Sequence, residues 1–106
     1  MTLVAQVKNL SHGYVRAGGK NNRRQQASRM LAFAAFASNQ GVRHIGQVGN
    51  KHVVSYWRML RKKSYSQPTL YSHWLAISHL WRLIEKSGEP PKPKVRVEAD
   101  QVCENN

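Results

Sequence analysis

The residues best suited to chemistry in this sequence form one short run, from Arg61 to Thr69. Three adjacent cations are followed by neutral hydrogen-bond donors; the run reads Arg61, Lys62, Lys63, Ser64, Tyr65, Ser66, Gln67, Pro68 and Thr69. Ser66 is a favoured helix N-cap and Pro68 is tolerated in a first helical turn, so a helix is predicted to begin here. A helix start carries unpaired N–H groups and the positive end of the dipole, which suits a phosphate. This combination is typical of contacts to the DNA backbone.

A second basic segment is predicted to be a flexible arm, Lys20 to Arg24, that feeds into a helix carrying Arg29. Such arms often become ordered only on a polyanion, although Arg24 could equally be an ordinary solvated charge. Ser66 taken alone is better explained as a cap, whereas the whole Arg61–Thr69 run is better explained by phosphate contact. The predicted DNA-binding residues are Lys20, Arg23, Arg24, Arg61, Lys62, Lys63, Tyr65, Ser66, Gln67, Thr69, Tyr71, Ser72 and His73.

The distribution of charge supports a polyanionic partner. The chain has a formal net charge of +12, and every Asp or Glu lies at or beyond Glu85. The first 84 residues hold thirteen Lys or Arg and no carboxylate. Solubility alone would explain a charged surface, but soluble proteins usually mix both signs. A segment that cannot neutralise its own field is expected to meet a polyanion, most commonly nucleic acid.

The aromatic residues divide into two predicted groups. Trp57, Trp74 and Trp81 fall at helical spacing among apolar residues, so they are predicted to be core. Tyr65 and Tyr71 are predicted to lie at the surface, where either could stack on a base or donate to a phosphate.

Enzymatic chemistry is not expected. The first 84 residues have no carboxylate and no thiol, and no two histidines have the i, i+4 spacing of a helical zinc site. We therefore predict no metal, no cofactor and no small-molecule substrate. The single Cys103 cannot form an internal disulfide, no apolar run is long enough for a membrane span, and the chain fits a reducing cytosol.

Hydrophobic periodicity predicts four helices, over about residues 3–11, 22–38, 51–63 and 67–87. Gly13, Gly18 and Gly19 are expected to break the first pattern, and Gly41 and Gly88 to end the second and fourth helices. Asn50 is the predicted N-cap of the third helix, whose expected apolar stripe is Val53, Val54, Trp57 and Leu60. Ile45 and Val48 are expected to plug the linker before it.

The predicted fold class is a small all-α, four-helix bundle with a flexible C-terminal tail. Residues 1–19 form an N-terminal helix and connector, and residues 20–89 form the helical core. Residues 90–106 begin with Pro90-Pro91-Lys92-Pro93, which cannot continue a helix, and are predicted to be a stiff linker and disordered tail.

The order of these segments resembles the N-terminal core-binding (SAM-like) domain of tyrosine recombinases and phage integrases. The resemblance covers about residues 20–93. Three stretches carry it: Ser66-Gln67-Pro68-Thr69-Leu70-Tyr71-Ser72-His73-Trp74-Leu75-Ala76-Ile77-Ser78-His79-Leu80-Trp81, His52-Val53-Val54-Ser55-Tyr56-Trp57-Arg58-Met59-Leu60, and the Arg24–Phe36 helix.

The resemblance implies a helical domain that clamps duplex DNA near the strand-exchange site, within a bacterial or phage-encoded cytoplasmic, nucleoid-associated protein. The contacts it implies are Lys62, Lys63, Ser66, Thr69, Tyr71, Ser72 and His73. Ser72, His73 and Ser78 stand where the family often has arginine. The family's catalytic domain would not fit after Pro93, so a non-catalytic chain is expected, whether an excised domain, a relic or a free-standing binder.

Three functions therefore remain open. The first is a non-catalytic, integrase-type domain in DNA integration or recombination, with recombinase protomers or a recombinase catalytic domain as further partners. The second is a small DNA-binding regulator or recombination directionality factor, although the last helix offers few base-reading side chains. The third is a basic protein-interaction module, and charge alone does not separate RNA from DNA.

Overall fold

The computed structural model describes residues 2–16 and 20–93. Four α-helices and one 3₁₀ turn follow one another, and the described residues contain no strand. The elements are α1 (Leu3–Arg16), α2 (Lys20–Asn39), η1 (Ile45–Gln47), α3 (Asn50–Lys62) and α4 (Gln67–Leu83). The prediction of an all-α, four-helix bundle is confirmed.

The first two helices are longer than the sequence pattern predicted. α1 continues through Gly13 to Arg16, and α2 already begins at Lys20, so the predicted flexible arm from Lys20 to Arg24 is helical. Gly13 inside a helix costs about 1 kcal/mol relative to alanine. That cost is offset because α1 packs along α2 and buries Leu3 and Val7. The predicted break at Gly13 is therefore wrong.

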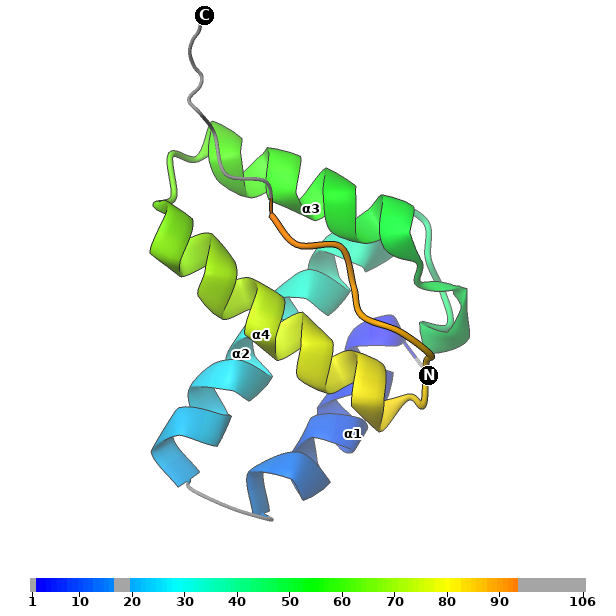
Figure 1. Ribbon diagram of the computed structural model, residues 1–106. Coiled ribbons are helices and arrows are strands. Elements are labelled where there is room, and N and C mark those ends of the chain that lie inside the picture. The colour runs from blue at the N-terminus through cyan, green and yellow to red at the C-terminus, as the bar shows by residue number, and fades with distance from the viewer. Residues whose placement is uncertain (1, 17–19, 94–106) are drawn as a thin grey trace, which may run out of the picture.

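α2 is the element around which the others pack. It contacts α1 and α4 extensively and α3 to a lesser degree. Figure 1 shows α1 and α2 as an antiparallel pair. α4 lies across this pair, and α3 runs along the top of the view. The alanines of α2 permit this close approach, since Ala27, Ala34 and Ala37 are all buried.

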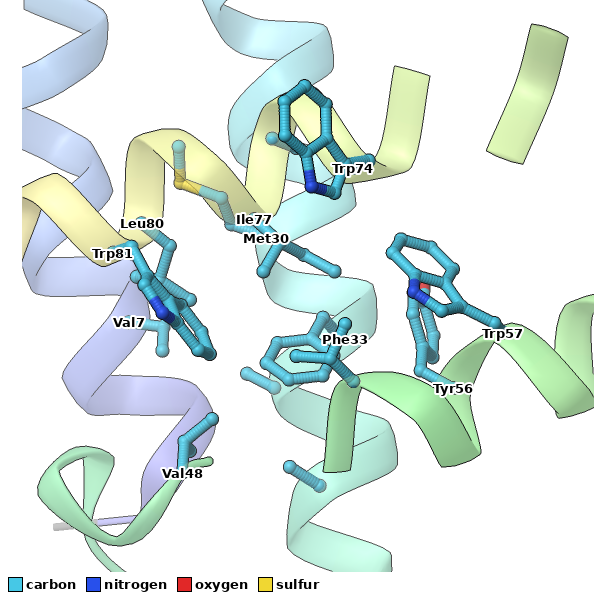
Figure 2. Close-up of a cluster of buried hydrophobic side chains, with 14 of the residues drawn as sticks. Val7, Met30, Phe33, Val48, Tyr56, Trp57, Trp74, Ile77, Leu80 and Trp81 are labelled. Carbon is cyan, nitrogen blue, oxygen red and sulfur yellow. The ribbon is translucent and has the colours of Figure 1, made fainter. Parts of the chain in front are cut away.

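The three tryptophans lie in the core, as predicted, and are at most 7% exposed. Figure 2 shows Trp57 and Trp74 apart from Trp81, with Phe33 between them. Two residues of α3 differ from the prediction. Val54 is 38% exposed, whereas Tyr56 is 1% exposed and contacts both Phe33 and Phe36 at ring-centroid distances of 5.3 Å. Of the two predicted linker plugs, Val48 is buried and Ile45 only partly so.

Three helices end in the same way, with a left-handed residue after the last turn. That residue is Gly41 (φ 95°) after α2, Ser64 (φ 64°) after α3 and Glu85 (φ 57°) after α4. The next N–H in each case reaches back to the last turn, from Val42 to Ala37 O, Tyr65 to Leu60 O and Lys86 to Trp81 O. This is the Schellman arrangement, which usually employs glycine.

Two predicted helix ends are therefore corrected. Gly88 (φ 77°) does not end α4, because the helix stops at Leu83 and Glu85 takes the left-handed position. Gly88 instead lies at a second bend of the chain. Asn50 is the first residue of α3 rather than its cap, which is Gly49. The predictions for Gly41 and for Ser66 as the cap of α4 are confirmed.

We expect Ser64→Gly to stabilise the protein by about 0.5–1 kcal/mol. A left-handed conformation costs an L-residue about 1–2 kcal/mol, and glycine avoids this cost while losing more entropy on folding. Urea unfolding measures the change. Ser66→Gly is the matched control, because it removes a capping hydroxyl two residues away and should not stabilise. Equal stability of Ser64→Gly and the wild type would show that Ser64 is not strained.

After α4 the chain turns back over the bundle. Residues 88–93 run between α3 and α4, and Pro90 and Pro93 are buried (Figure 1). Residues 90–93 thus pack against the helices, whereas the predicted tail from residue 94 lies outside the described residues. The proposed boundary between core and linker at residues 89 and 90 stays a prediction.

Candidate nucleic-acid interface

The α3–α4 corner, defined here as residues 61–72, contains most of the predicted site. α3 ends at Lys62, Lys63 caps it, and the left-handed Ser64 turns the chain towards α4. Lys62, Lys63 and Ser64 are exposed as a result, while Arg61 is half-buried. The two lysines can therefore reach a partner, and Arg61 adds charge closer to the protein surface.

The start of α4 offers fewer donors than the sequence suggested. Ser66 Oγ accepts a hydrogen bond from Thr69 N at 3.4 Å, and the two side-chain hydroxyls lie 3.0 Å apart. Pro68 has no N–H to give. Of the first-turn backbone groups, at most Gln67 N–H can face a phosphate. Lys62, Lys63 and the hydroxyls would thus have to supply most of the contacts.

The predicted contact residues further along α4 behave differently from one another. Tyr71 is 49% exposed and stacks on Trp74 with ring centroids 5.4 Å apart, so one ring face remains outward. Ser72 is half-buried, and its hydroxyl donates to Pro68 O at 3.2 Å. His73 is half-buried, with Nδ1 3.1 Å from Tyr56 Oη. Tyr71 is the most accessible of the three.

A half-buried polar cluster joins the corner to the core, and the sequence pattern did not indicate it. Tyr65, 46% exposed, lies 6.4 Å from the His73 ring, which in turn lies 5.7 Å from Tyr56. Burial raises the pKa of Tyr56 far above its usual value, and Tyr65 adds to the rise. Burial lowers the pKa of His73, helped by the Arg29 guanidinium on α2. Only the tertiary contacts bring these residues together.

Stability is expected to fall as the pH falls below about 6.5. The pKa values of His73, His79 and His52 are all lowered from 6.5, in each case mainly by burial and further by nearby cations. The unfolded chain therefore takes up protons at a higher pH than the folded chain does, so acidification favours unfolding until the folded pKa values are passed. Urea midpoints at pH 7.5 and 5.5 measure the change.

A His73→Gln variant tests the one of these three histidines that contacts Tyr56. It should be less sensitive to the drop from pH 7.5 to 5.5, because one of the three shifted groups is gone. An unchanged difference between the two urea midpoints would contradict a role for His73.

The second predicted basic segment lies elsewhere in the fold. Arg23 is half-buried, donates from Nη1 to Tyr14 O at 2.9 Å, and lies 4.5 Å from the Tyr14 ring centroid. This pair joins α2 to α1. Arg24 is exposed, while the side chain of Lys20 is not among those described. In Figure 1 the N-terminal end of α2 lies at the bottom of the view and the α3–α4 corner at its upper left, so the two basic segments do not form one surface.

Carboxylates are scarce in the described residues. Residues 2–16 and 20–93 contain fifteen Lys and Arg but only two carboxylates, Glu85 and Glu89. Both follow α4 in the chain, and Glu89 shares a pocket with Trp74 and Ser78 of that helix. Neither α3, the α3–α4 corner nor α4 therefore contributes a carboxylate that could pair with Lys62 and Lys63.

Within the part of the chain that the structure describes, no three His, Cys, Asp or Glu side chains gather as a metal site would require. None of the described helices combines the length and apolarity needed to cross a membrane. Comparison with protein-family models, curated proteins and solved structures finds no match to this chain.

Proposed function

We propose that the protein binds double-stranded DNA without cleaving it, mainly through phosphate contacts at the α3–α4 corner. One observation carries the proposal: Lys62 and Lys63 are exposed beside the start of α4, and neither α3, the corner nor α4 contains a carboxylate. Such a surface attracts a phosphate backbone from a distance and holds it through cations and hydroxyl donors.

The remaining corner residues have subsidiary roles in this proposal. Thr69 and Ser66 present hydroxyls beside the lysines, although Ser66 also caps α4 and the two hydroxyls lie 3.0 Å apart. Tyr65 and Tyr71 are about half exposed, so each can donate to a phosphate or contact a sugar. His73 faces Tyr56 instead and positions the corner from within.

The finer proposal is an integrase-type core-binding domain acting in DNA integration or recombination in the cytoplasm. Its support is the resemblance of residues 20–93 and the Ser66-capped start of α4. In that role the chain would act beside recombinase protomers or a recombinase catalytic domain. DNA binding at the corner does not depend on this finer assignment.

Fluorescence anisotropy with labelled duplex DNA tests the proposal. Log affinity should fall linearly with log salt concentration, with a slope of about −2 or steeper for two or more phosphate contacts. A single strand and a structured RNA of equal length, both unlabelled, serve as competitors of the labelled duplex. Preference for the single strand would favour base stacking on Tyr65 and Tyr71 instead. Absence of duplex binding at low salt would reject the proposal and favour a protein partner.

A further inference from the structure

The segment that folds back after α4 is held by side chains from two helices. Trp74 Nε1 donates to Pro90 O at 2.9 Å, Trp57 Nε1 donates to Pro91 O at 3.0 Å, and Gln67 Nε2 donates to Pro93 O at 3.3 Å. Lys92 Nζ lies 5.1 Å from the Trp74 ring centroid, within reach of a cation–π contact. Three of the four residues from Pro90 to Pro93 thus give their carbonyl to a side-chain donor.

The burial pattern of this segment has a period of three. Pro90 and Pro93 are buried, Pro91 is half-buried and Lys92 is exposed. A left-handed proline helix has three residues per turn, so positions i and i+3 share one face. Its rise of about 3.1 Å per residue carries Pro90 to Pro93 over about 9 Å. Their partners Trp74 and Gln67 are seven helical residues apart, or about 10 Å, so segment and helix match in length.

Trp57 of α3 together with Gln67 and Trp74 of α4 form the groove that holds residues 90–93, and the chemistry of this groove suits a proline helix. The three prolines have no N–H and can offer only carbonyl acceptors, and the groove presents N–H donors spaced to meet them. Donating indoles and a flat aromatic wall are the features with which proline-binding grooves recognise Pro-x-x-Pro ligands. The groove hydrogen-bonds the backbone, so recognition requires the proline helix rather than a covalent connection to α4.

We propose that the groove between α3 and α4 is a Pro-x-x-Pro recognition site that exchanges its ligand. Within one chain the site holds residues 90–93 of the same chain, and it takes the identical segment of a second copy when its own is displaced. The exchange needs movement only at residues 85–88, where the left-handed Glu85 and Gly88 reverse the chain. No contact in the groove would differ between the two arrangements. The inference does not rest on DNA binding.

The first arm of the test supplies the segment as a peptide. In the full chain with Pro90→Ala and Pro93→Ala, the segment should bind its groove more weakly. NMR follows the indole N–H signals of this variant. Those of Trp57 and Trp74 should move from their wild-type positions and return, saturably, when an end-capped Gly-Glu-Pro-Pro-Lys-Pro peptide is added. The Trp81 indole lies against Lys86 rather than against residues 90–93, so its signal reports separately on movement of residues 85–88. A peptide with alanine at the first and last prolines should bind at least about tenfold more weakly.

The second arm supplies the segment from a second copy. An unlabelled full chain with Trp57→Phe and Trp74→Phe keeps the proline segment but lacks the indole donors, so its segment is freed. Mixing it with the labelled Pro90→Ala, Pro93→Ala chain should restore the two indole signals and raise the apparent mass towards a dimer, whereas each chain alone stays monomeric.

Three outcomes would overturn the proposal. They are a folded labelled chain whose indole signals ignore both additions, equal binding of the proline and alanine peptides, and peptide binding without any response to the second chain. If the double proline variant does not fold, Gln67→Ala replaces it, since that change removes only the hydrogen bond to Pro93. Its wild-type segment then competes with the added peptide, so binding is followed by the anisotropy of a fluorophore-labelled proline peptide, which should rise with protein concentration while that of the alanine peptide stays flat.

Discussion

Replacing Lys62 and Lys63 together with alanine is expected to weaken duplex-DNA binding by one to two orders of magnitude at about 0.1 M salt. Each phosphate contact contributes about 0.9 to the slope of log affinity against log salt concentration, so two lost contacts flatten it by about 1.8. Both lysines are exposed at the end of α3, so the loss should not disturb folding. Anisotropy titrations at several salt concentrations measure both quantities.

A matched control removes the same charge elsewhere. Lys8 on α1 and Lys51 at the start of α3 are also exposed, and Lys8→Ala with Lys51→Ala leaves the corner intact. The control should flatten the salt slope much less. An equal loss in both double variants would mean that net charge, not the corner, drives binding. An unchanged slope in the Lys62, Lys63 variant would remove the corner from the interface.

Trp74→Ala is expected to lower the free energy of unfolding by about 3–5 kcal/mol, the usual cost of truncating a large core aromatic. Trp74 is only 7% exposed, and it also contacts Tyr71, holds Pro90 and lies under Lys92. A domain of this size has about 5–10 kcal/mol of stability in total, so the variant should be close to unfolding at 37 °C.

Urea unfolding of Trp74→Ala, followed by far-ultraviolet circular dichroism, measures this loss. Tyr71→Ala is the matched control, because Tyr71 lies on the same helix, stacks on the same indole and is 49% exposed. It should cost about 1 kcal/mol or less. A Trp74→Ala variant as stable as Tyr71→Ala would show that the core at this end of α4 is not rigidly packed.

The placement of α1 and α2 illustrates how tertiary contacts override local signals. Gly13 has low intrinsic helix propensity, yet it lies within α1 because burial of Leu3 and Val7 outweighs the cost. The stacking of Arg23 on Tyr14 likewise makes part of a predicted flexible arm into a contact between helices. Periodicity cannot anticipate such contacts, because each requires a neighbour that is distant in the sequence or that belongs to another element.

The proline segment was predicted from the same kind of local rule. Pro90 to Pro93 cannot continue a helix, so the break after α4 followed from the sequence alone. Packing of the segment on α3 and α4 depends on indole donors 16 and 34 residues away in the chain. The sequence thus predicted that residues 90–93 are not helical, which is confirmed, but did not reveal their contacts.

The sequence by itself determined the all-α class, the core tryptophans, the cap at Ser66 and the absence of carboxylates before Glu85. Each depends on periodicity, local capping chemistry or composition, which are properties of nearby residues. Only the tertiary structure decided that His73 turns towards Tyr56, that the two basic segments lie apart, and that Trp57 and Trp74 hold the proline segment. These features depend on how α2, α3 and α4 cross, and crossing is set by packing between residues far apart in the chain.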